Sequence, residues 1–451
     1  RYLAEFNMGY NGTENFAKGK RFGFFPAVSL GWVISEEKFF PKNNIVKYLK
    51  VRGSYGEVGN DQIGGDRFLY LPSSYGAASD SGVNKYNFGL ASNPYTSLMI
   101  VENKIGNPDL TWEKAKKMNV GVDINLFNNC LTASFDIFKE KRNNILANRS
   151  TSPMIIGANL PAYNFGEMEN RGWEMDLNFR HHIQDFHYWA RFNYSFARNE
   201  IIYMDEVQKR YDYQMTTGRR KNQFFGLIFD GYYNSWEEIN ALDRPKSSWS
   251  GNQLQPGDVK YVDVNQDGVI DDYDMVPIGY TPVPEIIYGF SFGAQYKGFD
   301  FSILFQGADN VSIKYFGRSM WPFAKGEESA KSLIKERWTQ ERYEAGEKIT
   351  FPRLSLNPNG ETDHNYRPST LWIRDASYLR LKNLEVGYTF TGGFVKRLNL
   401  NSVRLYFNGS NLFTWTDVVD LDPEAPSRSG NVEINTYPLQ KVYNIGLNIN
   451  F

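Results

Sequence analysis

The segment DVNQDGVIDDYD at 263–274 carries the oxygen-bearing side chains that bind calcium in proteins. The candidate ligands stand at the positions where a calcium loop presents its oxygens, with Val269 contributing a backbone carbonyl: Asp263, Asn265, Asp267, Val269, Asp271 and Asp274. Gly268 stands where such a loop turns sharply. Calcium binds about six to eight oxygens, so the spacing predicts Ca²⁺ as a cofactor.

Two features separate this loop from the helix-loop-helix type. Its last ligand position holds Asp274, whose side chain is shorter than the usual Glu, and its flanks VKYV and MVPIGY lack helical character. A free-standing loop is therefore predicted. The alternative is a turn rich in Asp and Asn that holds no metal, because these side chains also bond their own backbone.

The sequence lacks the residue patterns of common catalytic sites. The four His residues stand at 181, 182, 187 and 364, without a His-Glu-x-x-His motif, and no Gly-Lys-Ser/Thr phosphate-binding loop occurs. A single Cys, Cys130, cannot form a Cys-x-x-Cys site. The basic cluster GRRKN at 218–222 is interpreted as a solvated loop face. We therefore expect no enzyme, and the net charge of −1 gives no reason to expect nucleic acid as a partner.

The elements that position the loop are predicted to be β-strands. The segment VYNIGLNINF at 442–451 alternates aromatic and aliphatic residues with Asn and Gly. Successive side chains of a strand point to opposite faces, so one face of this segment is apolar and the other polar. About twelve such strands are predicted, and the clearest lie at 2–11, 119–127, 131–138, 172–179, 188–196, 286–296, 299–306, 384–390 and 403–408.

The connections between these strands alternate in length. Short turns are predicted at 127–129, 181–186, 297–300 and 392–399, and long segments at 57–111, 144–166, 203–283, 311–374 and 416–440. Structureless loops of this length are uncommon in compact soluble domains. Short turns at one end, long loops at the other and strands with one apolar face are typical of outer-membrane barrels.

Two other classes of fold fit less well. A mean hydropathy of −0.51 and the lack of apolar runs approaching ~20 residues exclude a helical membrane protein. Soluble β-sandwiches would need two or three domains, and no linker rich in Pro, Gly and Ser separates such domains. The prediction is an all-β, transmembrane antiparallel β-barrel with short periplasmic turns and long extracellular loops, whose last strand ends in the periplasm.

Several motifs together resemble the SusC/RagA-like TonB-dependent transporters of the Bacteroidetes outer membrane. They occur in the order typical of that family, over essentially the whole chain: FFPAVSLGWVISEEKFF (24–40), LKVRGSYGEVGNDQIG (49–64), NPDLTWE (107–113), ENRGWEMDL (169–177), GDVKYVDVNQDGVID (257–271), SYLRLKNLEVGYTF (377–390), NGSNLFTW (408–415) and YPLQKVYNIGLNINF (437–451). The resemblance implies that residues 1–451 are the C-terminal portion of the barrel, about the last 12 of 22 strands. It also implies that the plug domain is absent from this chain, and that 203–283 is an extracellular segment carrying the calcium-type loop.

The resemblance carries expectations about function and partners. It implies a nutrient importer of the cell outer membrane, embedded in outer-membrane lipid, that takes up an oligosaccharide or a peptide. A SusD-like lipoprotein would cover the extracellular mouth, and TonB–ExbB–ExbD would act through the plug. Substrate-binding residues are not assigned. The alternatives are a secreted calcium-binding β adhesin or carbohydrate-binding protein and, less favoured, an outer-membrane enzyme.

Overall fold

The computed structural model describes most of the chain. The described residues are 1–62, 67–72, 76–77, 85–90, 92–98, 100–101, 105–151, 160–249, 254–315, 320–323, 332–355, 363–419, 421–424, 431–432 and 439–451. Parts of the predicted long segments 57–111, 144–166, 203–283, 311–374 and 416–440 therefore lie outside the described residues.

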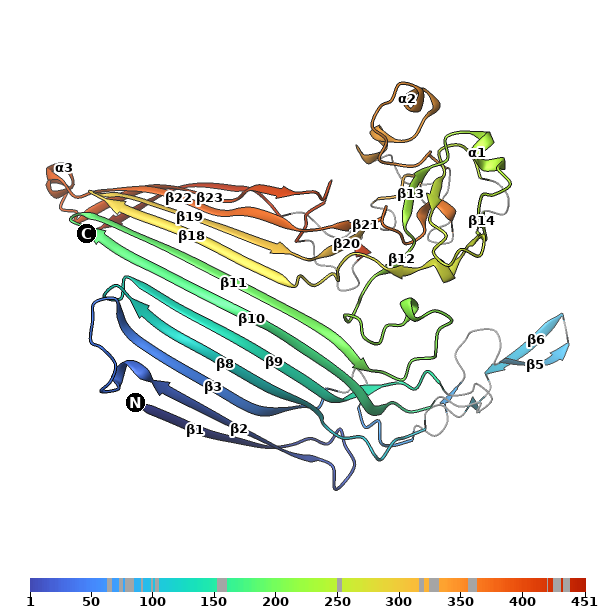
Figure 1. Ribbon diagram of the computed structural model, residues 1–451, viewed down its shortest axis with the longest axis horizontal. Helices are drawn as coiled ribbons and strands as arrows, with labels where there is room; N and C mark the ends of the chain where they lie inside the picture. Colours follow the sequence, from blue (N-terminus) through green and yellow to red (C-terminus); the bar gives the residue numbers. More distant parts are fainter. Residues whose placement is uncertain are drawn as a thin grey trace.

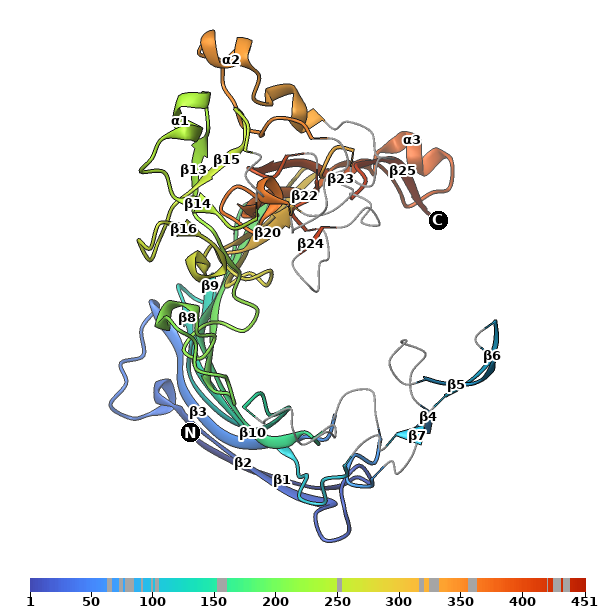
Figure 2. The same ribbon diagram turned by 90° about the vertical axis from the view of Figure 1, so that its right-hand side faces the viewer.

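A 12-stranded antiparallel sheet forms the body of the molecule (Figure 1). Each strand pairs with the next long strand of the chain, as the sequence predicted. In spatial order the strands are β1 (Tyr2–Gly12), β2 (Phe22–Val33), β3 (Val46–Asn60), β8 (Glu113–Leu126), β9 (Leu131–Ala147), β10 (Tyr163–Ile183), β11 (Phe186–Tyr203), β18 (Ile286–Tyr296), β19 (Phe299–Asp309), β22 (Tyr378–Phe390), β23 (Ser402–Thr416) and β25 (Val442–Asn450). The sheet curves into an open trough from β1 to β25 (Figure 2).

The register keeps one face of the sheet apolar and the other polar. Between β8 and β9, Val122 lies opposite Phe135, whereas Asp123 lies opposite Ser134 on the other face. Phe135 and Ile445 are exposed, so the apolar face is not the core of a two-sheet sandwich. This alternation agrees with the barrel prediction and disfavours soluble β-sandwiches.

Short connections gather at one end of the sheet, which we call the turn end. The β10–β11 turn consists of Gln184 and Asp185, and the β18–β19 turn of Lys297 and Gly298. Gln184, Lys297 and Gly298 have positive φ angles, the backbone shape that tight hairpins require. The predicted turn at 181–186 is shorter than expected, because β10 continues to Ile183 and β11 begins at Phe186.

The long segments gather at the opposite end, which we call the loop end (Figure 1). They carry short strands: β4 (Gly76–Ala77), β5 (Lys85–Leu90), β6 (Asn93–Leu98), β7 (Ile100–Val101), β12 (Phe225–Gly226), β13 (Phe229–Tyr232), β14 (Lys246–Ser247), β15 (Val259–Tyr261), β16 (Val269–Ile270), β17 (Val276–Pro277), β20 (Ser312–Tyr315), β21 (Ile373–Asp375) and β24 (Asn431–Val432). The helices are α1 (Trp236–Asn240), α2 (Gln340–Glu344) and, at the turn end, α3 (Gly393–Arg397). Among the described residues, no helix is long and apolar enough to cross a membrane.

Two charged clusters join neighbouring strands on the polar face. In the first, both terminal nitrogens of Arg52 on β3 donate to the Asp136 carboxylate on β9 at 2.6 Å, and Arg52 Nε donates to Asp123 on β8 at 3.1 Å. In the second, Arg404 on β23 contacts Glu385 on β22 and Asp300 on β19. Each arginine therefore ties three consecutive strands together, and we call these clusters the two clasps.

Each clasp passes over a glycine of its middle strand. A Cβ on Gly121 would lie 2.6 Å from Asp136 Oδ1 and 2.7 Å from Arg52 Cζ. A Cβ on Gly387 would lie 2.7 Å from Asp300 Oδ2 and from an Arg404 nitrogen. A side chain at either position would occupy the space through which the guanidinium crosses, so the clasp geometry requires glycine there.

We predict that Gly121→Ala in the complete protein lowers the free energy of unfolding by about 1–2 kcal/mol, because the methyl group pushes Arg52 away from Asp136. Thermal unfolding followed by circular dichroism measures the change. Gly53→Ala is the matched control, since the nearest atom to its added Cβ is Asn119 O at 3.8 Å. Equal losses in the two variants would mean that the clasp does not explain this glycine.

Candidate functional site

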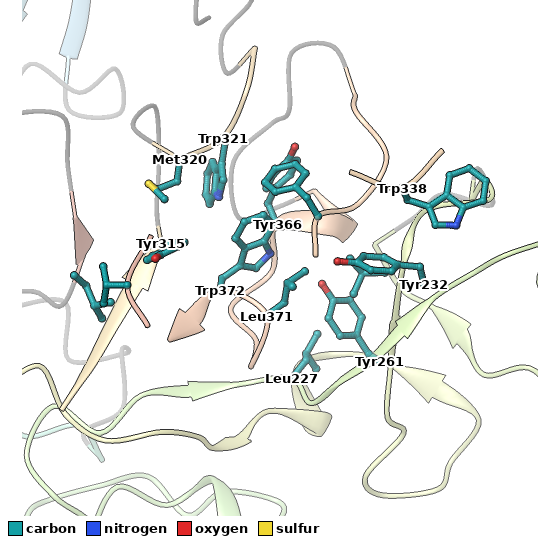
Figure 3. Packing of buried hydrophobic residues seen from close by; sticks show 14 of the residues in the cluster. Leu227, Tyr232, Tyr261, Tyr315, Met320, Trp321, Trp338, Tyr366, Leu371 and Trp372 are labelled. Atoms are coloured by element: carbon teal, nitrogen blue, oxygen red, sulfur yellow. The ribbon is translucent and has the colours of Figure 1, made fainter. Parts of the chain in front are cut away.

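The largest hydrophobic core lies at the loop end rather than in the sheet (Figure 3). Its aromatic centre packs Trp372 against Tyr366 at 5.3 Å and Phe351 at 5.5 Å between ring centroids. Leu227 and Tyr261 come to this core from the long segment 203–283, and Tyr315 comes from the long segment 311–374. We call the described parts of 225–278 and 311–376 the loop assembly. Because these segments share one core, they form a folded platform above the sheet.

A buried carboxylate links the segments of the loop assembly. Asp258 accepts hydrogen bonds from Arg353 Nε at 2.6 Å, Asn365 Nδ2 at 2.7 Å and the Gln255 amide at 2.7 Å. The side-chain oxygen of Asn365 in turn accepts from the Val259 amide at 2.9 Å. Such a buried charge is tolerated because it is both paired and hydrogen-bonded.

His364 lies beside this network and is almost fully enclosed. Its Nε2 lies 2.8 Å from the Val259 carbonyl oxygen, and its Nδ1 lies 2.8 Å from Ser247 Oγ. A carbonyl can only accept, so Nε2 carries the proton and Nδ1 accepts from the Ser247 hydroxyl. Burial lowers the pKa of His364, even though Asp258 and Asp363 oppose that shift. No pattern in the sequence points to this histidine, because its burial depends on segments far apart in the chain.

A second buried charge anchors the segment after β23. Arg380 on β22 is almost completely buried and donates to Asp422 at 2.6 Å and to Glu424 at 2.5 Å. Tyr378 donates its hydroxyl to Glu424 at 2.6 Å. These bonds hold residues 421–424 against the wall of the sheet.

The calcium-type loop 263–274 is described in full. Asp263 accepts from the amides of Gln266 at 2.7 Å and Gly268 at 2.8 Å, and Asp267 accepts from the Val269 amide at 3.0 Å. The side-chain oxygen of Asn265 accepts from the Asp267 amide at 2.9 Å. These short-range bonds are the Asx turns considered as the alternative to a metal site.

The other predicted ligands lie at the end of the loop. Asp274 is fully buried and accepts from the amides of Val264 at 2.8 Å and Asp271 at 2.9 Å, while Asp271 accepts from the Tyr273 amide at 2.7 Å. Burial raises the pKa of the Asp274 carboxyl. Val269 belongs to β16, which pairs in parallel with β14. Ser247 of β14 is the residue whose hydroxyl bonds to His364.

Within the described residues, which include all of 263–274, no three His, Cys, Asp or Glu side chains gather in a group that could hold a metal ion. The structure therefore brings the predicted ligands into one loop but turns their carboxylates toward backbone amides. Ca²⁺ remains a prediction from the spacing.

A cavity of about 310 Å³ lies at the loop end of β9, β10 and β11. Cationic, anionic and amide side chains line it together: Glu140, Arg142, Glu169, Asn170, Asn199, Arg220, Lys221 and Glu285. Most of the charges are paired, since Arg142 donates to Glu140 at 2.5 Å and Arg198 donates to Glu285 at 2.8 and 2.9 Å. Arg220 and Lys221 belong to the cluster at 218–222, so its interpretation as a solvated loop face was incomplete.

A curved antiparallel sheet with a polar face, an apolar face and folded segments at one end defines part of a membrane β-barrel wall. Residues 4–412 match the family model described as TonB dependent receptor-like, beta-barrel. The chain belongs to this family, whose members include receptors of the Bacteroidetes outer membrane, and its localisation is the outer membrane. The secreted alternatives are thereby set aside.

The chain resembles curated receptors over its whole length. It is 27% identical to TonB-dependent receptor P3 of Formosa agariphila and 28% identical to TonB-dependent receptor SusC of Bacteroides thetaiotaomicron. All of the chain is aligned in both cases, against 44% and 42% of those proteins, so it spans less than half of their length. Among solved structures, the RagAB peptide transporter matches with a TM-score of 0.74 and 23% identity, over 100% of this chain and 46% of that chain. That likeness supports the fold.

We predict that the loop assembly loosens as the pH falls below about 6.5, the pKa of an unperturbed histidine. The pKa of His364 is lower in the folded state than in the unfolded state, so the neutral imidazole favours folding. This contribution to stability is complete above the pKa of the unfolded state and is lost as the pH falls toward the pKa of the folded state. In that window, hydrogen-exchange protection of 246–249, 254–262 and 363–373 should fall by roughly tenfold per pH unit.

His364→Gln should remove this pH dependence, because the amide cannot be protonated in the range. His187→Gln, at an exposed position near the turn end, is the control and should keep it. A wild-type profile that is flat between about pH 7.5 and pH 5 would contradict the assignment of His364 as the titrating group.

Proposed function

We propose that this chain supplies the last 12 strands of a 22-stranded outer-membrane importer for oligosaccharides or peptides, driven by TonB and working with a SusD-like lipoprotein. The family match over residues 4–412 is the observation that carries the proposal. The similarity to SusC and to the fold of RagAB supports it. A second candidate function gains no support from the site.

The polar face of the sheet suits the inner wall of such an importer. Barrel strands point polar side chains inward and apolar ones to lipid. The clasps lie on the polar face, where their charges remain in contact with water and neighbouring polar groups. They tie strands together through ion pairs rather than apolar packing, which would leave the lumen beside them free for a plug and for substrate. TonB–ExbB–ExbD would act through that plug, which is proposed to lie in another part of the protein.

The loop assembly suits the extracellular platform on which a lipoprotein lid would rest. Its core packs together described residues of the long segments 203–283 and 311–374. Segment 57–111 lies at the same end, where the structure describes it (Figure 1). A preformed platform reduces the entropic cost of docking.

The cavity beside β9–β11 suits a polar stretch of substrate entering from the loop end. Hydroxyl groups of a glycan or the backbone of a peptide could bond to Asn170, Asn199 and Lys221. Lys221 is the residue to change when the role of the cavity in uptake is tested, because its side chain can be replaced without breaking the Arg198–Glu285 pair.

In the source bacterium, deletion of the gene should abolish TonB-dependent uptake of one class in a panel of labelled oligosaccharides and peptides, and the intact gene should restore it. Lys221→Glu should reduce uptake by roughly fivefold, the scale of an exposed charge contact of about 1 kcal/mol. Lys209→Glu, exposed in the same segment and outside the cavity, should leave uptake unchanged. Uptake of the whole panel that is unaffected by deletion would refute the proposed function.

We also propose that calcium binds at Asp263, Asn265, Asp267, Val269, Asp271 and Asp274. A cation near the buried Asp274 carboxylate would relieve its desolvation and the repulsion from Asp263. Extracellular calcium modules bind with a Kd of about 10⁻⁴–10⁻³ M. Millimolar calcium should therefore slow hydrogen exchange across 263–274.

The double variant Asp263→Ala with Asp267→Ala should lose this response while the barrel stays folded. Asp230→Ala with Asp243→Ala, in the same segment, is the control. Calcium content of the purified protein provides an independent measurement. If wild-type exchange across the loop is the same with calcium and with a chelator, the metal proposal fails.

A further inference from the structure

The apolar face of the sheet carries an unexpected zone of charge at the loop end. The register of five neighbouring strands places the following side chains together on that face, and we call them the outward belt: Glu57, Lys114, Lys116, Lys139, Lys141, Glu167, Glu169, Arg171 and Glu200. Apolar residues follow directly on the same face toward the turn end, including Met118, Ile137 and Trp173. The belt is thus the upper border of the lipid-facing surface.

Within the belt, the cations reach farther into the surroundings than the carboxylates. Lys139 contacts Glu169 at 2.9 Å, and their side chains are 54% and 17% exposed. Lys116 contacts Glu57 at 3.8 Å, with 44% and 20% exposed. The carboxylates therefore lie close to the sheet and hold the amines outward, and an exposed ion pair of this kind is weak enough for an external anion to compete.

The belt is confined to one side of the sheet. At the loop end of β23, the apolar face instead ends in the exposed aromatic residues Phe413 and Trp415. Aromatic side chains are the usual border residues of membrane barrels, whereas a row of lysines is not. This border of β3 and β8–β11 therefore differs from that of β23: it is charged, and its amines, held outward by the carboxylates, can contact an anionic group.

The height of the belt matches the headgroup layer of a membrane. Along β9, Lys139 lies eight residues from Leu131 at the turn end, a span of about 27 Å along the strand. A strand tilt of about 40° reduces this to roughly 20 Å, close to the ~25 Å apolar band of outer-membrane barrels. Lys139 and Lys141 therefore lie near the upper edge of the apolar band, from which their long side chains can extend the amines to the headgroup layer.

We propose that the outward belt binds phosphate groups of the lipid in the outer leaflet. Phosphorylated lipid would then bind preferentially to the side of the barrel that β3 and β8–β11 form. The inference rests on the proposed orientation, with the loop end outside the cell. Lysine ammonium groups bind phosphate as point charges, and the neighbouring apolar residues receive the acyl chains. The four lysines of the belt lie on β8 and β9, neighbouring strands about 4.8 Å apart, so they can contact more than one phosphate at once.

The test uses the complete purified protein in detergent, with diphosphoryl lipid A and the same lipid after enzymatic removal of its phosphates as probes. Native mass spectrometry and a binding titration by fluorescence provide the readouts. Wild type should bind the phosphorylated lipid at least roughly tenfold more tightly than the dephosphorylated one, and the difference should shrink as salt rises.

The triple variant Lys116→Gln, Lys139→Gln, Lys141→Gln should lose at least roughly tenfold in affinity for the phosphorylated lipid. The matched control changes three exposed lysines outside the belt, Lys18→Gln, Lys42→Gln and Lys209→Gln, and should bind as wild type does. Circular dichroism confirms that both variants are folded.

Equal binding of the two lipids, or equal binding by the two triple variants, would overturn the proposal. Crosslinking of the belt to a second protein in native membranes, in place of lipid, would also overturn it. The binding assay does not require transport, so its failure would leave the proposed uptake function standing. Failure of uptake would, conversely, leave a lipid-binding belt intact.

Discussion

Every feature of this wall depends on the two-residue period of its strands, enforced by the need to pair each backbone amide. In hydrocarbon an unpaired amide costs several kcal/mol, so neighbouring strands must remain in continuous register. Once the register is fixed, each side chain is assigned to a face. The pairing of Val122 with Phe135 on one face therefore brings Asp123 and Ser134 together on the other. The clasps and the outward belt both follow from that assignment.

The charged clasps show how the sheet holds its polar face together through ion pairs between strands. Arg52 and Arg404 each use a planar, multidentate guanidinium that can reach two carboxylates at once. A glycine beneath each guanidinium provides the passage. Because each clasp spans three strands, it resists sliding of one strand past the next. Its ion pairs add to the restraint that the backbone hydrogen bonds provide.

The strands could be predicted from the sequence because their signal is local. Alternation at 442–451 or 131–138 is visible within one strand. The first prediction agrees with β25, and the second has the start of β9 but ends too early, because β9 continues to Ala147. The clasps could not, since Arg52, Asp123 and Asp136 meet only after strands far apart in sequence have paired. The burial of His364 was hidden for the same reason, because residues near 247, 259 and 364 must first pack together. At 263–274 the spacing located a turned, Asp-rich loop, whereas occupancy by a metal depends on energies that spacing does not encode.

The calcium-type loop is not an appendage, because a short series of contacts joins it to the core of the loop assembly. Val269 and Ile270 pair with Lys246 and Ser247, and Ser247 bonds to His364, which bonds to Val259 beside the buried Asp258. Asp258 in turn holds Arg353 and Asn365 from the second long segment. Order in the loop is therefore linked to order in the whole platform. A ligand that stabilises the loop would favour the same packed state that neutral His364 favours, so the two effects would reinforce one another without direct contact.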